Sequence, residues 1–399
     1  MASVKDYRNG KYRVICCNGY LPNGKLNRFS KTITAKSMRD AEKQASVLEV
    51  HFKEGSLSQK TPSSREATFS QLVDRWRELK TGDLAEKTRE RYEGMLKDFM
   101  LPAFGNRKLS KIRALEIEQY LNSLKQAGVR KDGKPGGYSQ KTILSHYTIL
   151  HKLFNLALKW DMVQSNVCVK VDRPIVDAKE ASFYQEEEIV NMLSCLSAEA
   201  IMYQAYVLIA LVSACRRSEV LGLEWDDIDF DRNVITVRRT SHYTAERGIY
   251  TQDKLKNGQA SKTLTMPDDV MDFLKRYKLT QDSTRAAMGS QWIPCNRLFI
   301  AETGGSITPA GGPIHPDNIS QWFERFLLKS GLPRITLHQV RHTSISFLLN
   351  SGVDVDTVAK RAGHKNSQIT SSVYGHVFDK NMRDSANKFS GLLKKADIT

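Results

Sequence analysis

The first 53 positions are patterned first as strands and then as a helix. Residues 11–17 and 26–34 are rich in β-forming side chains and flank a turn rich in glycine and proline, which predicts a β-hairpin. Residues 37–53 then carry apolar side chains three or four positions apart: Ala41, Ala45, Leu48 and Phe52. We therefore expect a small module of two or three strands and one helix, followed by a polar linker over residues 55–64.

From residue 68 to residue 160, apolar residues recur almost throughout at the spacing of an amphipathic helix. Four helices account for them, over residues 69–76, 92–99, 115–124 and 142–160. We expect the second helix to end before Pro102, because proline has no backbone N–H to donate. The glycine-rich residues 129–138 predict a loop between the last two helices.

The rest of the chain mixes both kinds of pattern. Helical spacing covers residues 186–196 and 201–215, strand-like segments follow at 234–239 and 263–266, and several helices complete the sequence. The stretch between the two strand-like segments is less regular. The predicted fold class is a multidomain α+β chain: a small three-stranded sheet with one helix, a helical domain, and a mixed, mainly α-helical C-terminal domain.

The net charge of +16 over 399 residues is concentrated in the two N-terminal segments. Residues 1–64 hold 12 basic and 5 acidic side chains, residues 65–174 hold 21 and 13, and residues 175–399 hold 27 and 26. An excess of this kind on two modules favours binding to a polyanion such as nucleic acid. The nearly neutral C-terminal segment is the candidate for a different task.

Composition argues against several classes of protein. Apolar residues make up 40% of the chain, and no apolar stretch reaches the roughly 18–20 residues of a membrane span. The polar N-terminus predicts no secretory signal, and six irregularly spaced cysteines indicate reduced thiols, so we expect a cytoplasmic protein. Neither a Cys-x-x-Cys pair nor a Gly-x-x-x-x-Gly-Lys-Ser/Thr motif occurs, so we expect no metal and no cofactor.

Four short motifs of the C-terminal segment carry the candidate chemistry. The first two are Ala-Cys-Arg-Arg-Ser-Glu, residues 214–219, and Thr-Leu-His-Gln-Val-Arg-His-Thr, residues 336–343. The other two are Ala-Gly-His, residues 362–364, and Val-Tyr-Gly-His, residues 373–376. Each is weak alone, since an Arg-x-x-Glu on a helix is usually a surface pair and a lone tyrosine near a C-terminus usually belongs to the core or the surface.

Taken in this order, the motifs resemble those of the tyrosine recombinases, in particular phage- and transposon-type integrases. The resemblance covers essentially the whole chain, although the N-terminal modules match mainly in size, pattern and charge. It implies a site-specific DNA recombinase that integrates and excises a phage or mobile element through a 3′-phosphotyrosine intermediate and a four-way junction. The residues at the family's catalytic positions are Arg216, Lys256, His338, Arg341, His364 and the nucleophile Tyr374.

Local signals predict how the second motif is held. Thr336 and Gln339 make a capping box, so a helix is expected to begin at Leu337. His338 and Arg341 then lie on one face of its first turn. Donors at the positive end of a helix suit an anion.

The third motif predicts a helix end. A helix from about residue 354 is expected to finish at residues 361–362, with Gly363 in the left-handed conformation. This turn would let His364 leave the helix at a fixed angle. The alternative role for His364 is that of a helix-capping histidine.

These residue types suit transfer at a phosphodiester. Attack adds negative charge to the nonbridging oxygens, and the guanidinium groups of Arg216 and Arg341 match that charge and stay protonated. Ionising Tyr374 fully at pH 7 costs roughly 4 kcal/mol, which clustered cations lower or a neighbouring base avoids. The family uses a hairpin lysine as general acid, which matches Lys256, or Lys254 if the turn is longer.

Two neighbours and two departures complete the site. Glu219 is expected to orient Arg216 or its helix, and Lys262 is expected to contact a phosphate. The chain has Gln339-Val340 where Asp-Leu is frequent in the family, and Ala214-Cys215 where glycine and an apolar residue are usual. The capping box gives Gln339 a structural role, and Cys215 is interpreted as a small buried residue.

The resemblance also implies the domains and the partners. Residues 1–60 would bind arm-type DNA sites, residues 65–174 would form a helical, SAM-like core-binding domain, and residues 175–399 would be catalytic. The partners would be double-stranded DNA at core and arm attachment sites, three further copies of the chain in a homotetramer, a host DNA-bending protein and an excision factor. No membrane is involved, and the expected location is the nucleoid in the cytoplasm of a bacterial host.

Two other functions remain as alternatives. A non-catalytic DNA-binding regulator could keep this scaffold, and a relaxing topoisomerase could use the same nucleophile. The first is disfavoured because every expected catalytic residue type is present. The second is disfavoured by the separate N-terminal module.

Overall fold

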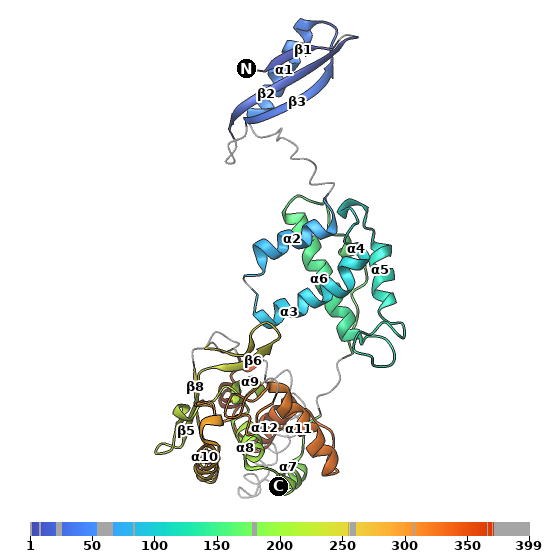
Figure 1. Ribbon diagram of the computed structural model, residues 1–399. Helices are drawn as coiled ribbons and strands as arrows, with labels where there is room; N and C mark the ends of the chain where they lie inside the picture. Colours follow the sequence, from blue (N-terminus) through green and yellow to red (C-terminus); the bar gives the residue numbers. More distant parts are fainter. Residues whose placement is uncertain are drawn as a thin grey trace, which may run out of the picture. The chain divides into compact units, whose positions relative to one another are not determined.

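The computed structural model describes most of the chain, namely residues 2–7, 9–20, 26–53, 67–82, 84–177, 182–253, 255, 261–305, 308–364, 366–368 and 370. Two compact units, Met1–Asp177 and Ala178–Thr399, make up the chain (Figure 1). Three of the predicted site residues, Lys254, Lys256 and Tyr374, lie outside the described residues. In the described part of the chain, no helix is both long and apolar enough to cross a membrane.

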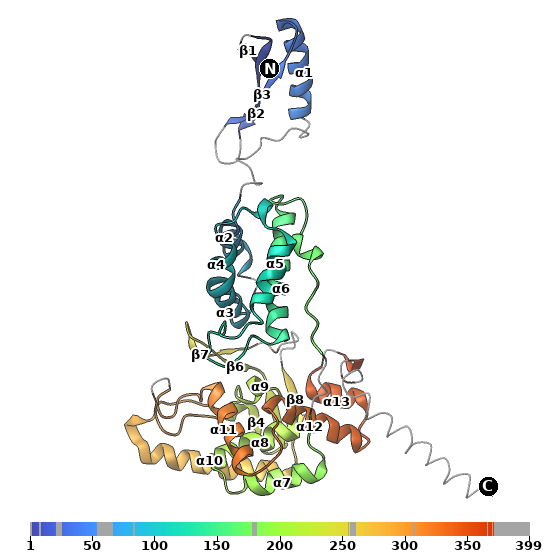
Figure 2. The ribbon, with the colours of Figure 1, turned by 90° about the vertical axis from the view of Figure 1, so that its right-hand side faces the viewer.

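The N-terminal module is a three-stranded antiparallel sheet with one helix on its face. Strands β1 (Ser3–Asp6), β2 (Lys11–Tyr20) and β3 (Leu26–Thr34) pair in that order, and α1 (Met38–Lys53) packs along them (Figure 2). Alternate residues of β2 are buried against apolar positions of α1, as period-two strands and amphipathic helices require. The buried residues are Tyr12, Val14, Cys16, Ala41, Ala45 and Phe52. The predicted hairpin and helix are confirmed.

From residue 67 on, the described part of the first unit is mainly helical. Its elements are α2 (Phe69–Lys80), α3 (Glu86–Met95), the π-helical turn η2 (Leu96–Met100), α4 (Leu101–Phe104), the 3₁₀ turn η3 (Leu109–Lys111), α5 (Ala114–Ser123), α6 (Gln140–Lys159) and the 3₁₀ turn η4 (Val167–Lys170). They enclose one hydrophobic cluster, whose largest members are Trp76, Phe69 and Phe154. The four predicted helical segments and the loop before α6 are confirmed.

The predicted end of the second helix before Pro102 is wrong. The N–H of Leu101 bonds to the carbonyl of Leu96, five residues back, and this wider turn is followed directly by α4. Pro102 occupies the first turn of α4. A proline can stand there because the π-helical turn directly before it interrupts the regular i→i−4 hydrogen-bond ladder, to which Pro102 has no N–H to donate.

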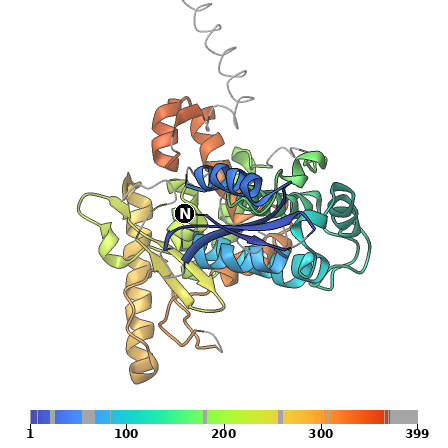
Figure 3. The same ribbon diagram turned by 90° about the horizontal axis from the view of Figure 1, so that it is seen from above.

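In its described residues, the second unit combines helices with two small sheets. Its elements are α7 (Glu186–Leu196), α8 (Ile201–Ser213), α9 (Arg217–Val220), η5 (Trp225–Asp227), β4 (Ile228–Asp229), β5 (Val234–Val237), β6 (Thr240–Thr244), β7 (Gly248–Gln252), β8 (Lys262–Thr265), α10 (Asp268–Met288), η6 (Gly289–Gln291), α11 (Pro316–Lys329), α12 (Leu337–Asn350) and α13 (Val355–Ala362). Strands β4, β5 and β8 form one antiparallel sheet, and β6 and β7 form a separate hairpin (Figure 3). The predicted helices and strands that fall on described residues are present, but the sequence pattern did not reveal the β6–β7 hairpin.

Candidate active site

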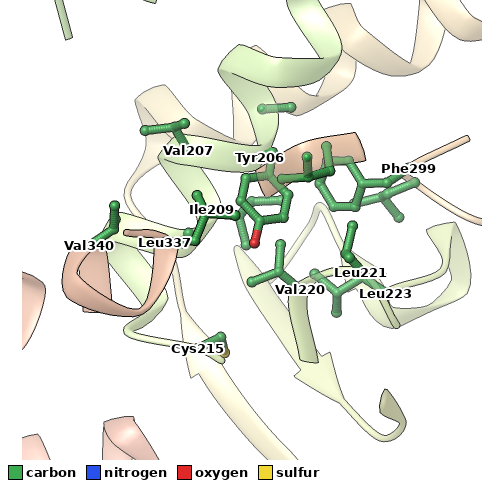
Figure 4. Close-up of a cluster of buried hydrophobic side chains, with 14 of the residues drawn as sticks. Tyr206, Val207, Ile209, Cys215, Val220, Leu221, Leu223, Phe299, Leu337 and Val340 are labelled. Atoms are coloured by element: carbon green, nitrogen blue, oxygen red, sulfur yellow. The ribbon is translucent and has the colours of Figure 1, made fainter. Parts of the chain in front are cut away.

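One hydrophobic core supports the first two motifs. Val220 and Leu221, just after the first motif, lie in the same buried cluster as Leu337 and Val340 of α12 (Figure 4). Tyr206 of α8 is part of this cluster and is almost fully buried. Protein cores pack as densely as organic crystals, so the backbones that carry the motif side chains have little freedom to shift.

Arg216 is held at the start of α9 by a buried carboxylate. The backbone N–H of Arg216 donates to Oε2 of Glu219 at 3.0 Å, and Nη1 of Arg216 donates to Oε1 at 2.8 Å. The Glu219 side chain is 1% exposed, whereas that of Arg216 is 24% exposed. Glu219 therefore lies in contact with Arg216, as expected for an orienting residue, and part of the guanidinium faces solvent.

The predicted helix start of the second motif is confirmed. Helix α12 begins at Leu337, the N–H of Gln339 donates to Oγ1 of Thr336, and the N–H of Thr336 donates to Oε1 of Gln339. His338 is exposed on the first turn. Arg341, three residues on, is only 3% exposed.

Arg341 reaches from α12 to the first motif. Its Nη1 donates to the carbonyl of Ala214 at 2.7 Å. Ala214 ends α8 in the left-handed conformation, with φ of 52°, and is fully buried. Arg341 is therefore fastened to the turn that leads directly into Arg216, and the two arginines belong to one site.

His364 leaves α13 as predicted. Gly363 has a φ of 69°, and the N–H of His364 donates to the carbonyl of Ala359 at 2.9 Å. Nδ1 of His364 lies 2.7 Å from Oγ1 of Thr370. Burial lowers the pKa of His364 to about 4, and the nearby Arg341, Arg216, His342 and Lys262 lower it further. The third motif therefore lies within electrostatic reach of both arginines.

His342 also lies at the site, although the motif pattern did not single it out. Its ring lies edge-on to that of His338, with 4.8 Å between the ring centroids. Burial lowers the pKa of His342 to about 4, and His338 and Arg341 lower it further. The signal was present in the sequence, because a position four residues after His338 shares its helix face.

Lys262 is not placed for the predicted contact with a phosphate. Its side chain is 7% exposed, and Nζ lies 3.0 Å from Oε2 of Glu219. Nζ also donates to the carbonyl of Arg361 at 3.4 Å. An ammonium group buried on a carboxylate is not available to a ligand at the surface, so this prediction is wrong.

The described residues thus assemble a positively charged centre around one buried carboxylate. Arg216 and Lys262 bind Glu219, and Arg341 binds the carbonyl of Ala214. His364, from a fourth segment, lies within electrostatic reach of these three cations. Guanidinium groups in such a setting suit an oxyanion. No cluster of three or more metal-ligating side chains occurs within the described ranges.

The histidine pKa values predict that the second unit loses stability in mild acid. Histidine has a pKa near 6.5 in an unfolded chain, whereas His342 and His364 have values of about 4. Between these values the unfolded state binds more protons, so the free energy of unfolding is greatest above pH 6.5 and falls toward pH 4. We expect the urea midpoint, followed by circular dichroism, to fall less steeply in His342→Gln than in the wild type. Parallel curves would contradict this.

Comparison with known proteins gives two matches to family profiles. Residues 182–381 match the phage integrase family, and residues 68–125 match the phage integrase N-terminal SAM-like domain. The ICEBs1 integrase of Bacillus subtilis (strain 168) is 23% identical over 391 residues, which cover 98% of this chain and 100% of that protein. The integrase of Staphylococcus phage L54a is 22% identical over 370 residues, which cover 87% and 99%.

Solved structures have a similar fold. The Tn1549 transposon integrase in complex with transposon right end DNA has a TM-score of 0.63 and 20% identity, with 81% of this chain and 100% of that chain covered. A lambda integrase tetramer bound to a Holliday junction has a TM-score of 0.52 and 16% identity, with 91% and 96% covered.

Proposed function

The chain belongs to the phage integrase family of tyrosine recombinases, and from this premise we propose that it is a site-specific recombinase of a phage or mobile element. It cuts and rejoins DNA through a 3′-phosphotyrosine intermediate and resolves a four-way junction. Integration and excision are the two directions of the same reaction. The relatives that are named integrases support this proposal.

The observation that carries the proposal is that the structure holds Arg216 and Arg341 at one site. Arg216 is held by Glu219, and Arg341 is held on the carbonyl of Ala214, two residues before Arg216. Two guanidinium groups at fixed positions can bind both nonbridging oxygens of one phosphodiester. They then stabilise the extra charge that builds up during attack.

In the proposed reaction, a neighbouring base takes the phenol proton of Tyr374 while Oη attacks the phosphorus and forms the new P–O bond. The bond from phosphorus to the 5′-oxygen breaks, and Lys256 donates the proton that converts this oxygen into a free 5′-hydroxyl. His338 and His364 complete the donors around the phosphate. Lys254 is the alternative general acid. The bond energy stays in the phosphotyrosine, so a 5′-hydroxyl from a second strand can reverse the step without a cofactor.

We further propose that the two N-terminal segments bind DNA, each at a different kind of site. Residues 65–174 would bind the core site, and the match of residues 68–125 to the SAM-like domain supports this role. Residues 1–60 would bind the arm sites, and residues 175–399 would carry out the chemistry. The uneven distribution of the net charge of +16 supports both DNA-binding roles.

The assembly would be a homotetramer on two duplexes, in the bacterial cytoplasm at the nucleoid. The lambda integrase tetramer on a Holliday junction supports this arrangement. A host DNA-bending protein and an excision factor would bias the direction.

The test is a suicide-substrate assay with purified full-length protein. Nicked duplexes that carry the candidate junction between element ends release a short fragment after cleavage, so the covalent complex accumulates. We expect a shifted protein–DNA band on a denaturing gel, in the presence of EDTA because arginines supply the charge. Bound DNA without a covalent band would favour the regulator. Relaxation of plasmids that lack the site, without joining of two sites, would favour the topoisomerase.

A further inference from the structure

Lys262 contacts two separate parts of the active site, the carboxylate of Glu219 and the C-terminal end of α13. It is the first residue of β8, and its Nζ binds Oε2 of Glu219 at 3.0 Å and the carbonyl of Arg361 at 3.4 Å. A Cβ atom added to Gly363 would lie 3.7 Å from both Cδ and Nζ of Lys262, so the turn that leads to His364 rests on this side chain.

The carboxylate of Glu219 is shared between Lys262 and Arg216. Oε2 accepts from Nζ of Lys262 and from the backbone N–H of Arg216, while Oε1 accepts from Nη1 of Arg216. Burial would raise the pKa of Glu219, but Lys262 and Arg216 outweigh burial and leave the pKa lowered. The carboxylate therefore stays charged and keeps accepting both bonds from Arg216.

Two described residues flank the candidate general acid Lys256 in the sequence. Residue 255 is a leucine buried in the core, at 5% exposure, and Lys262 is paired with Glu219. Lys256 lies between these two anchors in the sequence.

We propose that Lys262 is a positioning residue of the recombination reaction, which ties the Arg216 turn and the turn before His364 to one buried ammonium group. This inference rests on the proposed function. Lys262 acts through Glu219 and the backbone and does not touch DNA. Its loss should slow chemistry and leave binding unchanged.

The experiment compares Lys262→Met, Lys262→Gln and Lys262→Arg in the full-length protein. Methionine keeps the length of the stem without charge, glutamine keeps a donor without charge, and arginine keeps both. We expect Lys262→Met to form the covalent complex roughly 100-fold more slowly, as small misplacements of reacting groups do, and Lys262→Arg to recover most of the rate. If circular dichroism shows that Lys262→Met does not fold, the same measurements on Lys262→Gln test the proposal.

DNA affinity separates this role from a phosphate contact. A lysine on a phosphate would weaken binding and reduce the slope of log K against log salt by roughly 0.9. We expect the dissociation constant and the slope of Lys262→Met to equal those of the wild type. A reduced slope with weaker binding would overturn the positioning role.

The pH profile gives a readout that a purely structural role would not change. Removing Lys262 raises the pKa of Glu219, so the carboxyl becomes protonated at a higher pH and cleavage is lost earlier on acidification. We expect the acidic limb of the cleavage rate against pH to move to higher pH in Lys262→Met and to stay in place in Lys262→Arg. In addition, Lys262→Met combined with Glu219→Gln should be no slower than Glu219→Gln alone.

The outcomes distinguish this inference from the proposed function. The role of Lys262 alone would be overturned if the wild type forms the covalent band and Lys262→Met has the wild-type cleavage rate and pH profile. The same holds if the effects of Lys262→Met and Glu219→Gln are simply additive. Absence of the band with the wild type on its correct DNA would overturn the proposed function and, with it, this inference.

Discussion

The covalent protein–DNA band is expected to disappear completely when Tyr374 is replaced by phenylalanine. The substitution removes the one oxygen that forms the phosphotyrosine and changes no charge, so DNA binding should be retained. Because the intermediate cannot form at all, the loss has no residual rate, unlike the loss of a stabilising group. A suicide substrate read on a denaturing gel measures the band, and a mobility-shift assay measures binding.

A matched control separates this effect from a general effect of removing a phenol. Tyr203 lies in the same unit and stacks on Trp322, with 4.1 Å between the ring centroids and an angle of 4° between the planes. Tyr203→Phe keeps this ring and should keep the wild-type band. A band that survives in Tyr374→Phe would mean that another side chain is the nucleophile, and mass spectrometry of the DNA-linked peptide would identify it.

Features with a local cause could be predicted from the sequence. The start of α12 depends on two side-chain-to-backbone bonds between Thr336 and Gln339, three residues apart. The end of α13 depends on Gly363, which adopts a positive φ without steric penalty. Both signals need no tertiary contact, which explains why the predicted boundaries agree with the structure.

Features that depend on tertiary contacts could not be predicted. The strands β6 and β7 are short and largely polar, so residues 240–252 show neither the two-residue period of a strand nor the 3.6-residue period of a helix. Lys262 reads in the sequence as one more basic residue of a basic chain, and only the folded structure buries it on Glu219. Assigning Lys262 to a phosphate failed because sequence spacing does not reveal which charges pair.

Position 214 of the first motif combines a local backbone feature with tertiary contacts. Alanine stands at position 214 where the family usually has glycine, and the structure gives this residue a φ of 52°. The left-handed conformation is where glycine carries no Cβ penalty, and a non-glycine residue there costs roughly 1–2 kcal/mol. The buried Ala214 methyl group packs with Ile345 and Val358, and this burial offsets part of that cost.

Replacing Arg341 with alanine is expected to weaken both the fold and the chemistry. The 3% exposed side chain donates to the buried carbonyl of Ala214 at 2.7 Å, and an unpaired buried acceptor costs about 1–3 kcal/mol. Loss of one preorganised donor to the transition state slows a reaction by about 10²–10³-fold. Because the same bond holds the turn that leads into Arg216, the expected loss of cleavage is at the upper end of this range or beyond it.

Arg297 offers a matched control for the stability effect. It is 7% exposed and its Nη1 donates to the carbonyl of Gly222 at 2.8 Å, so Arg297→Ala also leaves a backbone acceptor unpaired. Single-turnover cleavage, measured below the unfolding transition of each variant, should fall far more in Arg341→Ala than in Arg297→Ala. Arg341→Lys should lie between the wild type and Arg341→Ala, since an ammonium keeps the charge but cannot reach Ala214 and a phosphate with one rigid fork. If Arg341→Ala is destabilised but cleaves like the wild type, Arg341 is a structural residue and Arg216 alone stabilises the charge on the phosphate.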